Sequence, residues 1–153
     1  MFMVTHTLRR RRHRGAAAVE FALVVPLLVM ILFGIMEFGY AFFIQASVAS
    51  AARVGVRSYA INWNTVAAPG NTAAQNETAA RNTAIALAKS APGLVTSDFV
   101  PNPTISPSCT TTTVGSQTTL TLTYRYHSLT GLLDGVLGQS IIVTGKGSMA
   151  CGG

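Results

Sequence analysis

The hydrophobic and polar positions of the chain separate one long apolar run from a mixed remainder. Residues 16–44 contain only two charged side chains, Glu20 and Glu37. This run exceeds the roughly 20 residues with which an α-helix crosses a hydrocarbon core, so it predicts one transmembrane helix. Residues 45–60 are rich in alanine, serine and valine, and the helix is expected to extend through them, over 16–60 in all.

Small residues along this helix permit close packing against another helix, as in transmembrane bundles. The candidates are Gly34, Gly39, Ala46 and Ala49. Packing of the helix against its own domain is an equally good interpretation. Pro26 removes one backbone hydrogen bond within the span and is expected to kink it.

Beyond residue 60 the pattern becomes mixed. A linker is expected over 61–76, where the sequence is polar and Pro69-Gly70 is a turn signal. A second helix is expected from about Thr72 to Ser90, and Pro92-Gly93 ends it. Residues 101–119, rich in proline, serine and threonine, predict an extended loop or a weak edge strand.

Two strands are expected near the C-terminus. Residues 118–127 alternate between apolar and polar, which predicts a half-buried strand. Its inner face would carry Leu120, Leu122, Tyr124 and Tyr126. Residues 140–150 predict a second strand, and the loop 128–139 between them has its own apolar residues, Leu129, Leu132, Leu133, Val136 and Leu137. The expected fold class is α+β, with a long N-terminal transmembrane helix continuing into a small extracytoplasmic domain, 77–153, that contains an antiparallel sheet.

Composition and charge support membrane association. The chain has 153 residues, 49% hydrophobic and only 10% charged, against about 25% charged in an ordinary soluble domain. The net charge of +6 comes mostly from a basic leader, 1–15, that holds Arg9, Arg10, Arg11, Arg12 and Arg14. The remainder is nearly neutral, so no nucleic-acid partner is expected. The positive-inside rule places the leader in the cytoplasm and the residues after about Phe43 outside, with the lipid bilayer as a partner.

A cleaved secretory signal is the main alternative for the N-terminal segment, since it also begins with basic residues. Its apolar core is usually about 7–15 residues, roughly half of the run found here. Residues 47–49 (SVA) are at most a weak cleavage site. Length and the two glutamates favour a membrane helix.

The two glutamates need an explanation, because a charge near the bilayer centre costs on the order of 3 kcal/mol or more. On a helix they lie about 25 Å apart, so each can sit near one membrane interface. That interpretation suits Glu37, which aromatic residues follow. Glu20 allows a second interpretation. A cut after Gly15 would create an ammonium group on Ala16, and the ammonium group of a neighbouring subunit could then pair with the Glu20 carboxylate inside lipid.

The same residues carry a family resemblance. A basic leader, Gly15, the sequence AAAVEF and an apolar helix resemble the processing site of type IV pilin-like precursors, which a prepilin peptidase cuts after the glycine. Over residues 12–60 the chain resembles the TadE-like proteins, which are minor pilins or pseudopilins of tight-adherence (Flp-type) pili. The matching positions are Gly15, Glu20, Phe21, Pro26, Gly34, Glu37, Gly39, Ala51, Ala52, Arg53, Gly55 and Arg57.

This resemblance implies roles for individual residues. The bond between Gly15 and Ala16 would be cut, Ala16 could then be N-methylated, and Glu20, Phe21 and Glu37 would belong to the recognition and assembly segment. The implied partners are a prepilin peptidase, other pilins or pseudopilins, and the pilus assembly platform in the bacterial cytoplasmic membrane. Phe21 stands where the major Flp pilins have tyrosine, which favours an accessory component over the main fibre subunit.

The two cysteines, Cys109 and Cys151, both fall on the expected outer side. In an oxidising compartment they are expected to pair. The bond would tie the last strand to the threonine-rich loop and contribute about 4 kcal/mol on the chain-entropy model. A free or metal-binding thiol pair is the alternative, although the sequence lacks the Cys-x-x-Cys spacing of many metal sites.

The sequence gives no reason to expect catalysis, a cofactor or a metal. His127, Ser128 and Asp134 are residue types found in catalytic triads, but neighbours on a strand point to opposite faces. Residues 145–148 (GKGS) lack the spacing of a phosphate-binding loop. Two functions remain: a processed minor pilin or pseudopilin that assembles through its N-terminal helix, and an uncleaved single-pass scaffold or binding module of the cell envelope.

Overall fold

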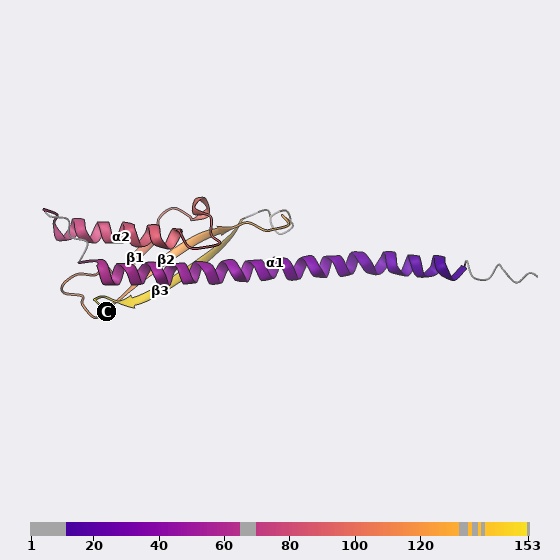
Figure 1. The fold of residues 1–153 in the computed structure, drawn as a ribbon, viewed down its shortest axis with the longest axis horizontal. Helices are drawn as coiled ribbons and strands as arrows, with labels where there is room; N and C mark the ends of the chain where they lie inside the picture. Colours follow the sequence, from indigo (N-terminus) through magenta and orange to yellow (C-terminus); the bar gives the residue numbers. More distant parts are fainter. Residues whose placement is uncertain (1–11, 65–69, 132–134, 136–137, 139, 153) are drawn as a thin grey trace, which may run out of the picture. The chain divides into compact units, whose positions relative to one another are not determined.

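The computed structural model describes residues 12–64, 70–131, 135, 138 and 140–152, without the side chains of residues 12–14. The elements in chain order are α1 (Arg12–Asn62), α2 (Ala73–Lys89), the short 3₁₀ helix η1 (Thr96–Asp98), β1 (Thr104–Ser106), β2 (Gln117–Tyr126) and β3 (Ile141–Ala150), as Figure 1 shows. A long apolar N-terminal helix, a second helix and a three-stranded antiparallel sheet confirm the expected α+β class.

The chain divides into two compact units, Met1–Phe38 and Gly39–Gly153, and α1 contributes residues to both. In the first unit, the described residues all belong to α1, which continues through Pro26. Its large apolar side chains are exposed, with Phe21 at 71% and Met30 at 74%. A helix that is apolar on all sides needs an apolar environment to cover it.

In the second unit, α2 begins where its first turn is capped. The Thr72 side chain accepts a hydrogen bond from the Gln75 backbone N–H, and the Gln75 side chain accepts one from the Thr72 backbone. This capping box satisfies two backbone donors that a helix start leaves free. The buried face repeats every four residues, at Ala80, Ala84 and Ala88.

The helices leave less room for a linker than the sequence indicated. α1 extends to Asn62 and α2 begins at Ala73, so both ends of the expected linker, 61–76, are helical. The expected range was too long at its C-terminal end because the first turn of α2 is solvent-exposed. Polar residues there are compatible with a capped helix as well as with a loop. Residues 65–69 lie outside the described residues.

The sheet has the order β1-β2-β3, and both strand pairs are antiparallel. On β2 the four predicted inner residues, Leu120, Leu122, Tyr124 and Tyr126, are all buried. The intervening threonines are partly exposed and Arg125 is exposed. The period-2 pattern therefore predicted the inner face of β2 correctly. The short strand β1, which pairs with residues 119–121, is the edge strand expected within 101–119.

The second predicted strand is present as β3, but its buried positions are glycines. Gly145 and Gly147 are buried, whereas Ile142 is 61% exposed. A Cβ atom at Gly145 would lie 2.6 Å from the Val48 backbone, and one at Gly147 would lie 2.6 Å from the Ala52 backbone. The GKGS sequence thus lets the α1 backbone approach β3 closely.

In the second unit α1 packs against both the sheet and α2 through one face. The buried members of that face are Ile44, Val48, Ala51, Ala52, Val56, Tyr59 and Ala60. At Gly55, a Cβ atom would lie 2.6 Å from Leu120 Cδ2 and 2.9 Å from Ala88 Cβ. Small residues here serve the packing of the helix on its own domain, while Ala46 is exposed.

The loop between β2 and β3 is described only in part. Its residues Leu132, Leu133, Asp134, Val136 and Leu137 lie outside the described residues. Leu129 is described and is 59% exposed.

Candidate functional site

The apolar part of α1 is the first candidate site. Within the described residues, one helix, Gly15–Asn62, is long and apolar enough to cross a membrane. Gly15, Ala16 and Glu20 are all exposed at its start, and Phe21 is 71% exposed. In the part of the chain that the structure describes, a Cβ atom at Gly15 would meet nothing within 4 Å. The residues at the expected cut are thus accessible, as a processing enzyme would require. Arg9, Arg10 and Arg11 lie outside the described residues.

The two glutamates of the helix lie in different surroundings. Glu20 is exposed, whereas Glu37 is only 4% exposed. Of the two, Glu20 is the more accessible group.

Beyond the apolar segment, α1 presents a free face in the second unit. Arg53 and Arg57 are exposed, and Val54 is 50% exposed. Because residues four apart on a helix lie on one side, the two arginines share this face. It lies away from the buried residues Ala52 and Val56.

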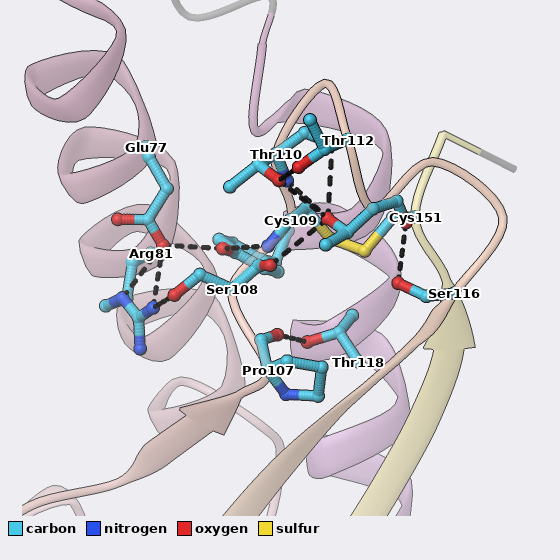
Figure 2. The surroundings of a disulfide bond; sticks show 12 residues. Glu77, Arg81, Pro107, Ser108, Cys109, Thr110, Thr112, Ser116, Thr118 and Cys151 are labelled. Carbon is cyan, nitrogen blue, oxygen red and sulfur yellow. Dashed lines mark hydrogen bonds and ion pairs between the residues drawn. A yellow bond between two sulfur atoms is a disulfide. The ribbon is translucent and has the colours of Figure 1, made fainter.

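The disulfide Cys109–Cys151 is the second candidate site. It has an S–S distance of 2.02 Å and joins residues 42 positions apart. Both cysteines are 1% exposed. The Cys151 backbone N–H donates to the Ser116 carbonyl at 2.9 Å, as Figure 2 shows. The bond therefore closes the end of β3 onto the segment between β1 and β2.

A polar network adjoins the disulfide and links three segments. Glu77 Oε1 accepts hydrogen bonds from Tyr59 Oη at 2.5 Å and from Arg81 Nη2 at 2.7 Å. Arg81 also donates to Ser108 Oγ at 2.7 Å, as Figure 2 shows. A further hydrogen bond of 2.9 Å joins Arg81 to the Ile105 carbonyl. Tyr59 Oη in turn accepts the Cys109 backbone N–H at 3.0 Å. Through these contacts α1, α2 and the cysteine loop are held together.

Sequence reasoning missed this network. Glu77 and Arg81 are four residues apart on the predicted second helix, a spacing that allows an ion pair, so their contact could have been found. The participation of Tyr59 depends on how α1 and α2 pack, and no local pattern encodes that.

The network changes the acidity of Glu77. Burial alone would raise the pKa of this carboxyl, but hydrogen bonds from Tyr59 and Arg81 and the charge of Arg81 outweigh it, so the pKa is lowered from 4.5. A lowered folded-state pKa means that ionised Glu77 stabilises the fold at neutral pH. That contribution is lost as the pH falls below 4.5 and through the folded-state pKa.

Replacing Glu77 by glutamine should therefore destabilise the protein in a pH-dependent way. The free energy of unfolding at pH 7 should fall by about 1–3 kcal/mol, because Tyr59 and Arg81 lose a charged acceptor. The difference in unfolding free energy between the variant and the wild type should become smaller below pH 4.5. Denaturant unfolding at several pH values measures both. In a variant that already carries Arg81→Met, Glu77→Gln should lower the free energy of unfolding by a smaller amount, because the ion pair is already absent. A difference that does not change with pH would show that the Glu77 charge does not matter.

A further titratable contact lies near the start of the β2–β3 loop. His127 Nε2 is 3.7 Å from Asp98 Oδ1, and Tyr124 donates to Asp98 Oδ2 at 3.3 Å. The described residues hold no group of three or more His, Cys, Asp or Glu side chains that could bind a metal ion.

Together these features define a class of protein: a candidate single-span membrane protein whose apolar helix leads into an α+β unit with a disulfide. Residues 15–57 match the family model described as TadE-like protein, and through this segment the chain is TadE-like. The match confirms the resemblance noted over 12–60 and begins at Gly15. Neither a curated protein nor a solved structure matches the chain.

Proposed function

We propose that the chain is a minor pilin or pseudopilin that takes part in assembling a tight-adherence (Flp-type) pilus. The observation that carries this proposal is the TadE-like segment, 15–57, which contains the exposed apolar part of α1. An apolar surface of this kind can lie in lipid before assembly and against the helices of other pilins afterwards. The same surface thus serves anchoring and packing.

Processing by a prepilin peptidase would come first. The peptidase would cut between Gly15 and Ala16 and remove the basic leader. Before the cut, the leader arginines would hold the N-terminus in the cytoplasm, and the residues after about Phe43 would be outside. The disulfide suits an oxidising extracytoplasmic compartment.

Assembly would then depend on Glu20. Its exposed carboxylate can accept the ammonium group of Ala16 from a neighbouring subunit, and such pairing makes a charge tolerable inside lipid. Phe21, which is 71% exposed, would pack beside it. Glu37 is the less accessible carboxylate and has the smaller part in this contact.

Replacing Gly15 by valine tests the proposed cut. Among the described residues, a Cβ at Gly15 would contact no other side chain or segment, so the variant should insert in the membrane normally. It should keep its leader, because the peptidase no longer meets a glycine. Gly34→Val is the matched control, since a Cβ there also meets nothing within 4 Å. Intact mass distinguishes the two. Leaders retained in the wild type and the control alike would favour an uncleaved, membrane-anchored scaffold or binding module.

Replacing Glu20 by alanine tests the assembly step. Removing one partner of a buried ion pair costs about 3–5 kcal/mol, so incorporation into pili should fall on the order of a hundredfold or more, with membrane fractionation unchanged. Val19→Ala, at an exposed neighbouring position, controls for loss of side-chain volume. Sheared-pilus yield is the measurement. Normal yield from the Glu20 variant would rule out the pairing role.

A further inference from the structure

The second unit has a well-defined end at which α1 enters it. Tyr40, two residues into this unit, lies with its ring centroid 5.7 Å from that of Tyr126 at the end of β2. At the other end of the unit, the Gly152 backbone N–H donates to the Ala60 carbonyl at 3.0 Å. The hairpin end of β2 and β3 and the C-terminal end of β3 therefore lie at opposite ends of the unit (Figure 1), and Cys151 of the disulfide directly follows the second. We call the first the entry end.

The segment between α2 and β1 reaches the same end. A Cβ atom at Gly93 would lie 2.9 Å from Phe43 Cζ. The Val95 backbone N–H donates to Tyr124 Oη at 3.2 Å. Val95 therefore lies beside the last residues of β2. Three separate parts of the chain, namely α1, the 93–95 segment and the β2–β3 hairpin, meet at the entry end.

Large apolar side chains are exposed on all three parts. We call them the entry-end residues: Phe42 (70% exposed), Phe43 (51%), Val95 (56%), Leu129 (59%) and Ile142 (61%). Leu129 is three residues beyond Tyr126, within about 10 Å along the chain. They do not all lie on one face, because Ile142 pairs with the exposed Arg125 on the outer face of the sheet. What they share is the end of the unit at which they lie, and a surface that caps this end would contact all of them.

Charged residues flank this surface in a way that fits a membrane interface. Arg125 is exposed and pairs across the strands with Ile142. Lys89 Nζ lies 5.9 Å from the centre of the Phe99 ring, which packs edge-on against Tyr124. One acidic residue, Asp98, also lies at this end, and it accepts a hydrogen bond from the Tyr124 hydroxyl. Apolar side chains with basic residues beside them are typical of surfaces that lie against anionic lipid.

We propose that the entry end of the second unit lies against the membrane, with Val95, Leu129 and Ile142 inserted among the lipid headgroups. Lipid is the occupant because the helix that enters at this end is the one candidate membrane span in the described residues. This second contact would fix the orientation of the unit on the membrane, which a single helix alone cannot do. The proposal needs only the span, so it holds for a processed or an uncleaved chain.

Tryptophan placed at an entry-end residue tests the proposal. Phe42 and Phe43 belong to α1 and would approach lipid in any case, so Leu129→Trp is the informative variant. Val114→Trp is the matched control, because Val114 is 61% exposed and Gly115 beside it bonds to Cys151 at the opposite end. Both variants carry Trp63→Phe, which removes the natural tryptophan. The full chain is reconstituted in phosphatidylethanolamine–phosphatidylglycerol vesicles with or without brominated acyl chains.

The emission of the Leu129→Trp variant should shift to shorter wavelength and lose intensity with brominated lipid. The Val114→Trp variant should show neither change. Equal emission and equal quenching of the two variants would overturn the proposal. A blue shift at position 129 without quenching by bromine would also overturn it, because the surface would then be covered by protein and not by lipid.

Discussion

Gly147→Ala should destabilise the second unit by about 3 kcal/mol, although it adds a single methyl group. The Cβ atom would lie 2.6 Å from the carbonyl carbon and oxygen of Ala52 and from the backbone nitrogen of Arg53. Backbone atoms of a helix cannot move aside as a side-chain end can, so α1 must separate from β3. An alanine also restricts the unfolded chain, which stabilises by only about 0.4–1 kcal/mol and does not offset the clash.

The matched control for this effect is Gly135→Ala. Among the described residues, a Cβ atom at Gly135 would meet nothing within 4 Å, so the free energy of unfolding of this variant should change little. Guanidinium titration followed by near-ultraviolet circular dichroism measures both variants. Equal midpoints for the two would mean that α1 does not pack directly on β3. Gly145→Ala should behave like Gly147→Ala, because its Cβ would lie 2.6 Å from the Val48 carbonyl group.

Removal of the disulfide should have the largest effect on stability. The double variant Cys109→Ala, Cys151→Ala should lose about 4 kcal/mol of unfolding free energy, because the unfolded chain regains the freedom of a long loop. Alanine is the appropriate replacement, since both positions are 1% exposed and a hydroxyl would add a buried polar group.

Reductant supplies the control for this double variant. Dithiothreitol should lower the unfolding midpoint of the wild type to that of the variant and leave the variant unchanged. If the variant and the oxidised wild type unfold at the same denaturant concentration, the bond contributes nothing. The account of the cysteine loop would then need another source of stability, such as the Tyr59–Cys109 hydrogen bond.

Local patterns predicted the elements of this protein well. The apolar run indicated α1, alternation indicated β2 with its four inner residues, and Thr72 marked the start of α2 within one residue. Each of these signals is carried by neighbouring residues, since periodicity and capping act over one or two turns.

Contacts between distant segments were not predictable in the same way. Gly145 and Gly147 have no hydrophobic signal, yet they occupy the buried face of β3 because the helix backbone fills the space. Tyr59 meets Glu77 only because α1 and α2 pack side by side. The entry-end residues likewise come from separate parts of the chain. Sequence alone could suggest the apolar character of Leu129 but not that the 93–95 segment lies beside Phe43 and Tyr124.

The central claim is that a processed form of this chain joins a pilus through α1. The most direct measurement is the N-terminal residue and intact mass of the protein recovered separately from sheared pili and from membranes. The account predicts a chain that begins at Ala16 in the pilus fraction, with the residues up to Gly15 removed. A chain found only in membranes and still beginning at Met1 would contradict it.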